Sequence, residues 1–195
     1  MGSKTMRAWV EGDSRALVEF TNQRDAGTAI LKIGEDLWLF SPTADEADKL
    51  SGPLLRQSMM GSDLSFEEAL ESKSILELYD ARVVDDEVVD GRRCYVLELV
   101  AREGAEVSYH RRKVWVDCER YISLLEESYA PSGKLLKRSR TERVQRFGQR
   151  YYPVSVVVED TTRKGSSTRF LVETIVFDGP IPAHTFTMER LTGRL

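Results

Sequence analysis

The sequence has few of the residue types that build metal sites. Its two histidines, His110 and His184, are far apart, whereas a zinc or iron site uses two or three histidines, usually closely spaced. Its two cysteines, Cys94 and Cys118, do not form a CxxC pair. We interpret both histidines as structural or surface residues, and we expect the protein to use no metal and no other cofactor.

Motifs for nucleotide binding and nucleophilic catalysis are also missing. The patterns GxxxxGKS/T, GxGxxG and GxSxG do not occur. The acidic run at residues 85–87 lacks the ligand spacing of an EF-hand loop, and we interpret it as a solvated turn. Two carboxylates brought together in three dimensions are not excluded by sequence alone. Because no feature indicates catalysis, we predict that the protein is not an enzyme.

The charge balance and the lack of long apolar runs argue against two further classes. The net charge is -4 and the pI is about 5.4, whereas a nucleic-acid binder normally has a basic surplus. The basic runs at residues 111–113 and 137–140 lie in alternating segments with acids nearby, which indicates solvated strand faces. No apolar run approaches the roughly 18–20 residues that cross a bilayer, so no transmembrane segment is expected. Residues 1–5 have the character of an expression leader, and we expect the native sequence to begin near Met6.

Period-two alternation of apolar and polar residues is what the sequence has in abundance. Turn residues such as Asp90-Gly91 and Pro131-Ser132-Gly133 separate the alternating runs. This pattern predicts a meander of antiparallel strands in one domain at residues 6–195, not a parallel α/β sheet. The predicted strands are 6–12, 15–22, 27–34, 36–42, 76–85, 93–101, 107–117, 121–130, 134–147, 151–162 and 167–179.

Some of these strands are apolar on both faces. In the run DLWLF, Leu37 and Leu39 share one face, and Trp38 and Phe40 share the other. A strand with one solvated face would carry polar residues there. The pattern therefore predicts cover on both faces, or a curved sheet with an apolar hollow.

Residues 51–72 interrupt the alternation with helical spacing. A first short helix is expected at residues 54–59, with Gly61 as its left-handed cap. Ser65 and Glu68 form a capping-box pattern that opens a second short helix. The apolar contacts offered by the two helices are Leu54, Leu55, Met59, Phe66 and Leu70. The spacing does not distinguish a lid over an apolar cavity from a plug in a filled barrel.

The hairpin that contains both cysteines predicts their separation. A turn at residues 104–106 would pair Leu97 with Trp115 and Cys94 with Cys118. Facing Cβ atoms in a sheet are roughly 4.5–5.5 Å apart, a little wide but adjustable to a disulfide. Whether the bond forms stays open, because a register error of one or two residues would separate the thiols.

Several strings resemble the outer-membrane lipoprotein-sorting protein family, the relatives of the periplasmic lipoprotein carriers LolA and LolB. The strings are GTAILKIGEDLWLFSPTAD, RQSMMGSDLSFEEAL, VVDGRRCYVLELVA, SYHRRKVWVDCE, YAPSGKLLKRSRTERV and GQRYYPVSVVVEDTTRKGSSTRFLVETIVFD. The final IPAHTFTMERL is similar to the family's closing strand. Family members normally carry a signal peptide, a helix and a strand before the counterpart of MRAWV, so we expect a chain that lacks these parts.

The resemblance implies a mainly β protein, with a curved antiparallel sheet that forms an incomplete barrel and a helical lid at about residues 51–72. It implies a periplasmic carrier of lipoprotein acyl chains or other lipids toward the outer membrane, with an inner-membrane transporter and an outer-membrane acceptor as partners. A calyx-type binder of another small hydrophobic ligand and a non-catalytic β-rich interaction module are the alternatives. The candidate cavity or lid residues are Trp38, Phe40, Leu54, Leu55, Met59, Met60, Phe66, Leu97 and Trp115.

Overall fold

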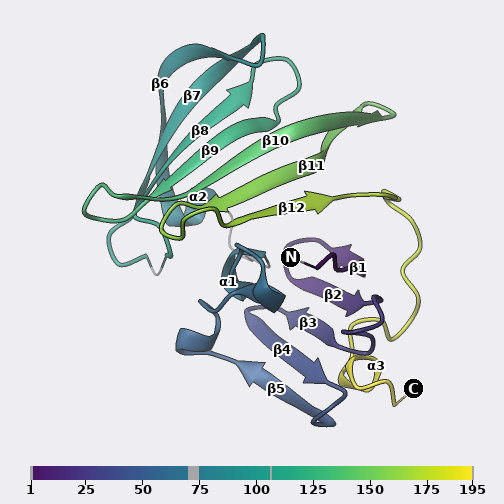
Figure 1. Ribbon diagram of the computed structural model, residues 1–195. Helices are drawn as coiled ribbons and strands as arrows, with labels where there is room; N and C mark the ends of the chain where they lie inside the picture. Colours follow the sequence, from purple (N-terminus) through teal and green to yellow (C-terminus); the bar gives the residue numbers. More distant parts are fainter. Residues whose placement is uncertain (1, 70–74, 106, 195) are drawn as a thin grey trace. The chain divides into compact units, whose positions relative to one another are not determined.

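The computed structural model describes residues 2–69, 75–105 and 107–194 and contains two antiparallel β-sheets (Figure 1). The chain divides into two compact units. The first consists of Met1–Gln57, Ser65–Lys73 and Val176–Leu195, and the second of Ser58–Leu64 and Ser74–Ile175. Among the described strands neither sheet closes on itself, so each is an open sheet.

The sheet of the first unit is a five-stranded meander in the order β1-β2-β3-β4-β5. Its strands are β1 (Met6–Glu11), β2 (Arg15–Phe20), β3 (Ala29–Ile33), β4 (Asp36–Ser41) and β5 (Glu46–Leu50). The first four strands were predicted from alternation. Strand β5 was not, because the segment EADKL is mostly charged; its backbone nevertheless pairs with β4 along the edge of the sheet.

The inner strands β3 and β4 carry buried residues on both faces, as the run DLWLF predicts. On one face Trp38 and Phe40 belong to a cluster that packs against Leu191. On the other face Leu37 and Ile30 are buried. A strand that is buried on both faces has no need of polar alternation.

The C-terminal segment forms a helix where a closing strand was expected. Helix α3 (Met188–Leu191) begins at the N-cap Thr187, whose hydroxyl accepts a hydrogen bond from the Arg190 N–H at 3.2 Å. The prediction of a strand was wrong because it rested on similarity alone, whereas an N-cap threonine favours a helix.

The sheet of the second unit is a seven-stranded meander in the order β12-β11-β10-β9-β8-β7-β6. Its strands are β6 (Tyr79–Val89), β7 (Arg92–Ala101), β8 (Arg111–Asp117), β9 (Ser123–Tyr129), β10 (Leu135–Phe147), β11 (Arg150–Asp160) and β12 (Ser167–Leu171). The long strands curve together (Figure 1), and register shifts in β6 and β10 mark bulges that add to such curvature. Strand β12 is shorter than predicted, since residues 172–179 leave the sheet.

The helical stretch consists of shorter turns than predicted. Two 3-10 turns, η1 (Gly52–Leu54) and η2 (Met59–Gly61), replace the expected helix at residues 54–59. Gly61 has the predicted left-handed conformation, with a φ of 81°. Helix α2 (Ile75–Leu78) was not predicted; it leads directly into β6.

The capping box is confirmed at the start of α1 (Phe66–Ala69). The Ser65 N–H donates to Glu68 Oε2 at 2.7 Å, and the Glu68 N–H donates to Ser65 Oγ at 3.2 Å. Leu70 and the predicted end of the lid at residues 70–72 lie outside the described residues.

Candidate functional site

The seven-stranded sheet has two chemically different faces. Along β7, Leu97 and Leu99 project to one side, and Cys94 and Val96 project to the other. We name these sides the Leu97 face and the Trp115 face, because Trp115 pairs with Val96. One row of cross-strand partners crosses the whole Leu97 face: Val83, Leu97, Val114, Glu126, Ser139, Val158 and Thr168.

Charged side chains cover the Trp115 face. The Trp115 indole N–H donates to Glu87 Oε2 at 2.8 Å, and the Lys113 ammonium lies 4.5 Å from the centroid of the Trp115 ring. Below these groups Trp115 packs with Cys94 and Val96. Further ion pairs on this face are Arg111–Glu98 and Arg138–Glu127. Arg111, Lys113 and Arg138 are thus partly exposed, as the basic runs predict, but they lie over a buried apolar cluster.

The Leu97 face carries large apolar side chains that water reaches. Val83 is 61% exposed, Val88 is 70% exposed and Tyr95 is 42% exposed. Strand parity and pairing place all three on the side of Leu97. The apolar strip that they form adjoins the buried cluster of Tyr79, Leu99 and Val114. It is crossed by one exposed ion pair, since Asp86 lies between Val83 and Val88 on this face and accepts a hydrogen bond from Arg93 Nε at 2.9 Å. Exposed apolar surface that adjoins a core in this way is typical of a binding surface.

A half-buried ion pair lies on the Leu97 face beside this cluster. Arg112 Nε lies 3.0 Å from a Glu126 carboxylate oxygen. The Arg112 guanidinium also lies 5.5 Å from the centroid of the Tyr79 ring and 5.7 Å from that of Tyr109. Arg112 was predicted to lie on a solvated strand face, and this was wrong, because alternation turns it away from its neighbours Arg111 and Lys113.

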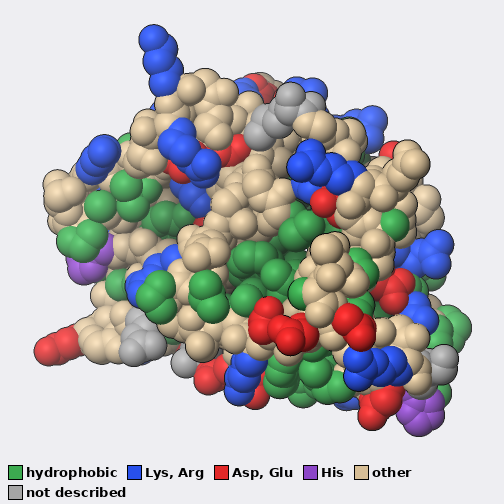
Figure 2. Space-filling model, turned by 60° about the horizontal axis from the view of Figure 1, so that its bottom comes forward, with side chains coloured by type: hydrophobic (Ala, Val, Ile, Leu, Met, Phe, Trp, Pro, Cys, Tyr) green, Lys and Arg blue, Asp and Glu red, His purple; other side chains and the backbone are tan. Residues whose placement is uncertain are grey.

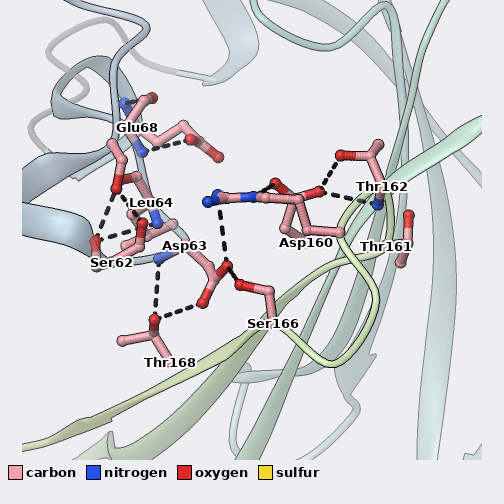
Figure 3. Close-up of polar contacts among 12 residues, drawn as sticks. Ser62, Asp63, Leu64, Glu68, Asp160, Thr161, Thr162, Ser166 and Thr168 are labelled. Carbon is pink, nitrogen blue, oxygen red and sulfur yellow. Dashed lines mark hydrogen bonds and ion pairs between the residues drawn. The ribbon is translucent and has the colours of Figure 1, made fainter. Parts of the chain in front are cut away.

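The loop Ser58–Leu64 is tied to the far end of the same row, at Thr168 (Figure 3). The Asp63 N–H donates to Thr168 Oγ1 at 2.9 Å, and the Thr168 hydroxyl donates to Asp63 Oδ2 at 2.6 Å. The Ser166 hydroxyl donates to Asp63 Oδ1. Thr168 shares its face with Val158 and Leu97, so the loop lies on the Leu97 face.

The sequence did not single out Asp63, although it lies in RQSMMGSDLSFEEAL, one of the strings that carry the resemblance. A short polar residue close behind a left-handed glycine, as Asp63 is two residues after Gly61, commonly bonds to neighbouring backbone or hydroxyl groups. That signal is too common to identify a distant partner such as Thr168.

The predicted cavity residues do not form one group. Trp38 and Phe40 pack in the cluster of the first sheet. In the helical stretch, Phe66 is buried and Leu54 is exposed, whereas Leu55 is half-buried. These five residues belong to the first unit.

The other four predicted residues belong to the second unit. Met59 is buried and Met60 is half-buried, both in the loop Ser58–Leu64. Leu97 and Trp115, predicted to face each other, lie on opposite faces of the sheet, because Leu97 pairs with Val114 and Trp115 with Val96. The predicted register is one residue out, and a shift of one residue moves a side chain to the other face.

The same shift separates the cysteines. Cys94 pairs with Asp117, and the Cys118 N–H donates to the carbonyl of Arg93 at 3.0 Å. Both cysteines are free thiols in the structure. Burial raises the pKa of the Cys94 thiol, and the neighbouring Asp117 carboxylate adds to this effect. The predicted pairing of Cys94 with Cys118 was wrong.

A second polar centre closes the turn after β8. The Asp117 side chain is fully buried and accepts hydrogen bonds from the Arg92 guanidinium and from the N–H groups of Glu119 and Arg120, the last two at 2.9 and 3.1 Å. The hydrogen bond from Arg92 lowers the pKa of Asp117 to about 2, against the opposing effect of burial. These contacts hold the backbone of the turn, so the role of Asp117 is structural.

The surface carries both signs of charge. On the side drawn in Figure 2, Lys and Arg side chains are interspersed with Asp and Glu, and no single sign dominates. Within the described ranges, no group of three or more His, Cys, Asp or Glu residues could hold a metal ion. In the same ranges, no helix has the length and apolar character needed to span a membrane.

A family model described as "-like: Uncharacterized protein" matches residues 12–193. The chain belongs to this family. None of the curated proteins matches it. Its fold is similar to the folds of three solved structures, one of which is described as a LolA superfamily protein.

The first is described as an outer membrane lipoprotein-sorting protein domain from Vibrio parahaemolyticus, with 24% identity and a TM-score of 0.84 over 97% of this chain and 83% of that chain. The second is a DUF1329 family protein from Desulfovibrio piger, with 26% identity and a TM-score of 0.82 over 91% and 76%. The third is a LolA superfamily protein from Nitrosomonas europaea, with 23% identity and a TM-score of 0.70 over 96% and 82%. The predicted resemblance is thus confirmed for the fold.

Proposed function

We propose that this LolA-like protein is a non-catalytic periplasmic carrier that holds the acyl chains of a lipoprotein or another lipid against the Leu97 face. The observation that carries the proposal is the exposure of Val83, Val88 and Tyr95 beside a buried apolar cluster, on a strip that one ion pair, Asp86–Arg93, crosses. The similarity of the fold to a structure described as a lipoprotein-sorting domain supports it. A carrier of this kind would receive its passenger from an inner-membrane transporter and deliver it to an outer-membrane acceptor.

Passive burial is sufficient for such a role. Each methylene that moves from water into apolar surroundings gains about 0.8 kcal/mol, so an acyl chain prefers an apolar face to water without any chemical step. The ion pair of Arg112 and Glu126 gives the same face a polar centre. An amphiphile could place its chain along the strip and its polar end near this pair.

The strip is tested by displacement of a fluorescent dye. A polarity-sensitive naphthalene sulfonate dye should bind the protein, and a long-chain fatty acid or a lipopeptide should displace it. Val83→Ser with Tyr95→Ser should weaken displacement about tenfold or more, because two apolar contacts worth about 1 kcal/mol each are lost.

Val10→Ser is the matched control, since Val10 on β1 is 64% exposed but belongs to the first unit. It should leave displacement unchanged. Equal affinity of the double variant and the wild type would contradict the proposed site. Displacement by small apolar ligands but not by fatty acid or lipopeptide would favour the calyx-type binder.

A further inference from the structure

The last part of β10 and the first part of β11 form a hairpin that extends beyond their other neighbours in the seven-stranded sheet (Figure 1). β10 pairs with β9 only as far as Arg140, and β12 pairs with β11 only from Ser155 onward. Among the described pairings, residues 143–153 therefore have no third strand beside them, and we name these residues the arm. Val144 packs at its base against the cluster of Trp115, but residues 145–153 belong to neither described cluster of this sheet. The length of the arm thus indicates a contact outside the sheet.

The arm is cationic although the protein as a whole is acidic. Residues 143–158 contain no Asp or Glu, whereas Arg143, Arg146 and Arg150 are all exposed. None of the described ion pairs includes Arg143 or Arg146; the Nε of Arg146 donates to the Gly148 carbonyl at 2.8 Å. The acid that precedes the arm, Glu142, is bonded to Arg169 at 2.9 Å. The positive charge of the arm is therefore open to an anionic partner.

Aromatic rings lie among these arginines. The guanidinium groups of Arg146 and Arg120 lie 5.8 and 5.3 Å from the centroid of the Tyr151 ring, so the β8–β9 turn, which contains Arg120, lies beside the arm. The next residue of that turn, Tyr121, is 76% exposed and has a φ of 53°. This left-handed conformation is strained for a bulky side chain, whereas glycine adopts it freely. The turn thus keeps an aromatic ring in water at a cost to the backbone.

We propose that the arm and the β8–β9 turn dock this protein on a lipid surface that carries anionic phosphate headgroups. Guanidinium groups bind phosphate through paired N–H donors, and several basic side chains together attract anionic lipids. Tyrosine, with an apolar ring and a polar hydroxyl, favours the boundary between headgroups and acyl chains. The net charge of -4 argues against a nucleic acid, because its extended phosphate backbone would also meet acidic surface. The proposal goes beyond the carriage of acyl chains and does not depend on where they bind.

Flotation with lipid vesicles tests the docking without any passenger. The protein should float with vesicles of equal parts phosphatidylcholine and phosphatidylglycerol, but not with vesicles of phosphatidylcholine alone. Added salt should weaken the binding, because it screens exposed charges. Arg143→Gln with Arg150→Gln should lower the affinity about tenfold or more, since each arginine near an anionic surface contributes about fivefold.

Lys134→Gln with Lys164→Gln is the matched control. It removes the same charge, but these exposed lysines lie in the β9–β10 and β11–β12 turns, at the opposite end of the meander. Its affinity should stay within about twofold of the wild type, because attraction to the lipid surface falls off within a Debye length. Equal affinities of the two double variants, or equal binding of the wild type to both kinds of vesicle, would overturn the proposal.

Tyr121→Gly separates docking from folding. Glycine relieves the left-handed strain, so the midpoint of thermal unfolding should stay the same or rise, while loss of the ring should weaken vesicle binding several-fold. Unchanged vesicle binding would overturn the role of this turn.

Two competitors distinguish the lipid surface from other anions. Inorganic phosphate should displace the protein from vesicles no more than chloride at the same ionic strength, and stronger displacement would overturn the proposal in favour of a soluble phosphate. Retention on polyglutamate without vesicle binding would overturn it in favour of an acidic protein segment. Dye displacement at the Leu97 face decides the proposed function separately, because the arm variants leave Val83 and Tyr95 in place.

Discussion

The buried Asp117 carboxylate gives the fold a pH dependence with a defined sign. Its pKa is lowered to about 2 in the folded protein, chiefly by the hydrogen bond from Arg92. The stabilisation is therefore complete above the pKa of the unfolded chain, near 3.8, and is lost as the pH falls toward 2. We expect this group to contribute about 2 kcal/mol to the free energy of unfolding near neutral pH.

Urea denaturation of the wild type and of Asp117→Asn at a series of pH values measures this contribution. The variant should be less stable near neutral pH, and the difference between the two free energies of unfolding should shrink between about pH 5 and about pH 2. Asp48→Asn, on the exposed edge strand β5, is the control and should follow the wild type. A constant difference for Asp117→Asn over this range would contradict the assignment.

The two thiols should differ in reactivity. Cys94 is fully buried and its thiol has a raised pKa, whereas Cys118 is partly exposed. Because the thiolate is the reactive form, Cys118 should react with a thiol reagent in the native protein and Cys94 only after unfolding. Titration with a chromogenic disulfide reagent counts the thiols that react in the native protein and, with denaturant added, those that react only after unfolding. Equal reaction rates for the two thiols, or loss of both free thiols after mild oxidation, would instead favour a disulfide between Cys94 and Cys118.

A single residue of register explains why these side chains were misplaced from sequence. Alternation correctly predicted β7 and β8 as strands, but it did not determine how many residues the loop between them contains, and this number sets the register. The predicted turn at residues 104–106 made a hairpin that was one residue out. That error exchanged the neighbours of Leu97, Trp115 and Cys118, because side chains alternate between faces.

Helix α3 should contribute strongly to the first unit through one residue. Leu191 is buried in the cluster that contains Phe40 and packs against Trp38. Leu191→Ala should lower the free energy of unfolding by about 2–5 kcal/mol, the usual cost of such a cavity. Met188→Ala on the same helix is the control, since Met188 is exposed and should cost less than about 1 kcal/mol. Equal losses in urea denaturation would contradict the packing of α3 on this sheet.

Local chemistry predicted some elements well and others not at all. The capping box at Ser65 and Glu68 and the left-handed Gly61 were confirmed because a few adjacent residues determine them. Strand β5 was missed because its charged residues form a strand only through pairing with β4. In the same way, α3 depends on an apolar surface that is distant in the sequence.

The order of strands within each sheet followed from the meander of alternating runs, since short turns join antiparallel neighbours. The division into two sheets did not follow, because the break between β5 and β6 falls in the helical stretch. Nor did alternation indicate on which face of the second sheet the exposed apolar side chains lie. Glu87 and Lys113 lie over Trp115, whereas Val83 stays exposed. Both outcomes depend on which residues pair across neighbouring strands.

The central claim is that acyl chains lie along the Leu97 face, and photo-cross-linking tests it most directly. A fatty acid with a diazirine on its chain would be bound, irradiated and mapped by peptide mass spectrometry. We predict adducts on β6 and β7, in the peptides that contain Val83, Val88 and Tyr95, which an excess of unlabelled fatty acid suppresses. Adducts confined to the first unit, around Trp38 and Phe40, or spread over the surface without competition, would contradict the account.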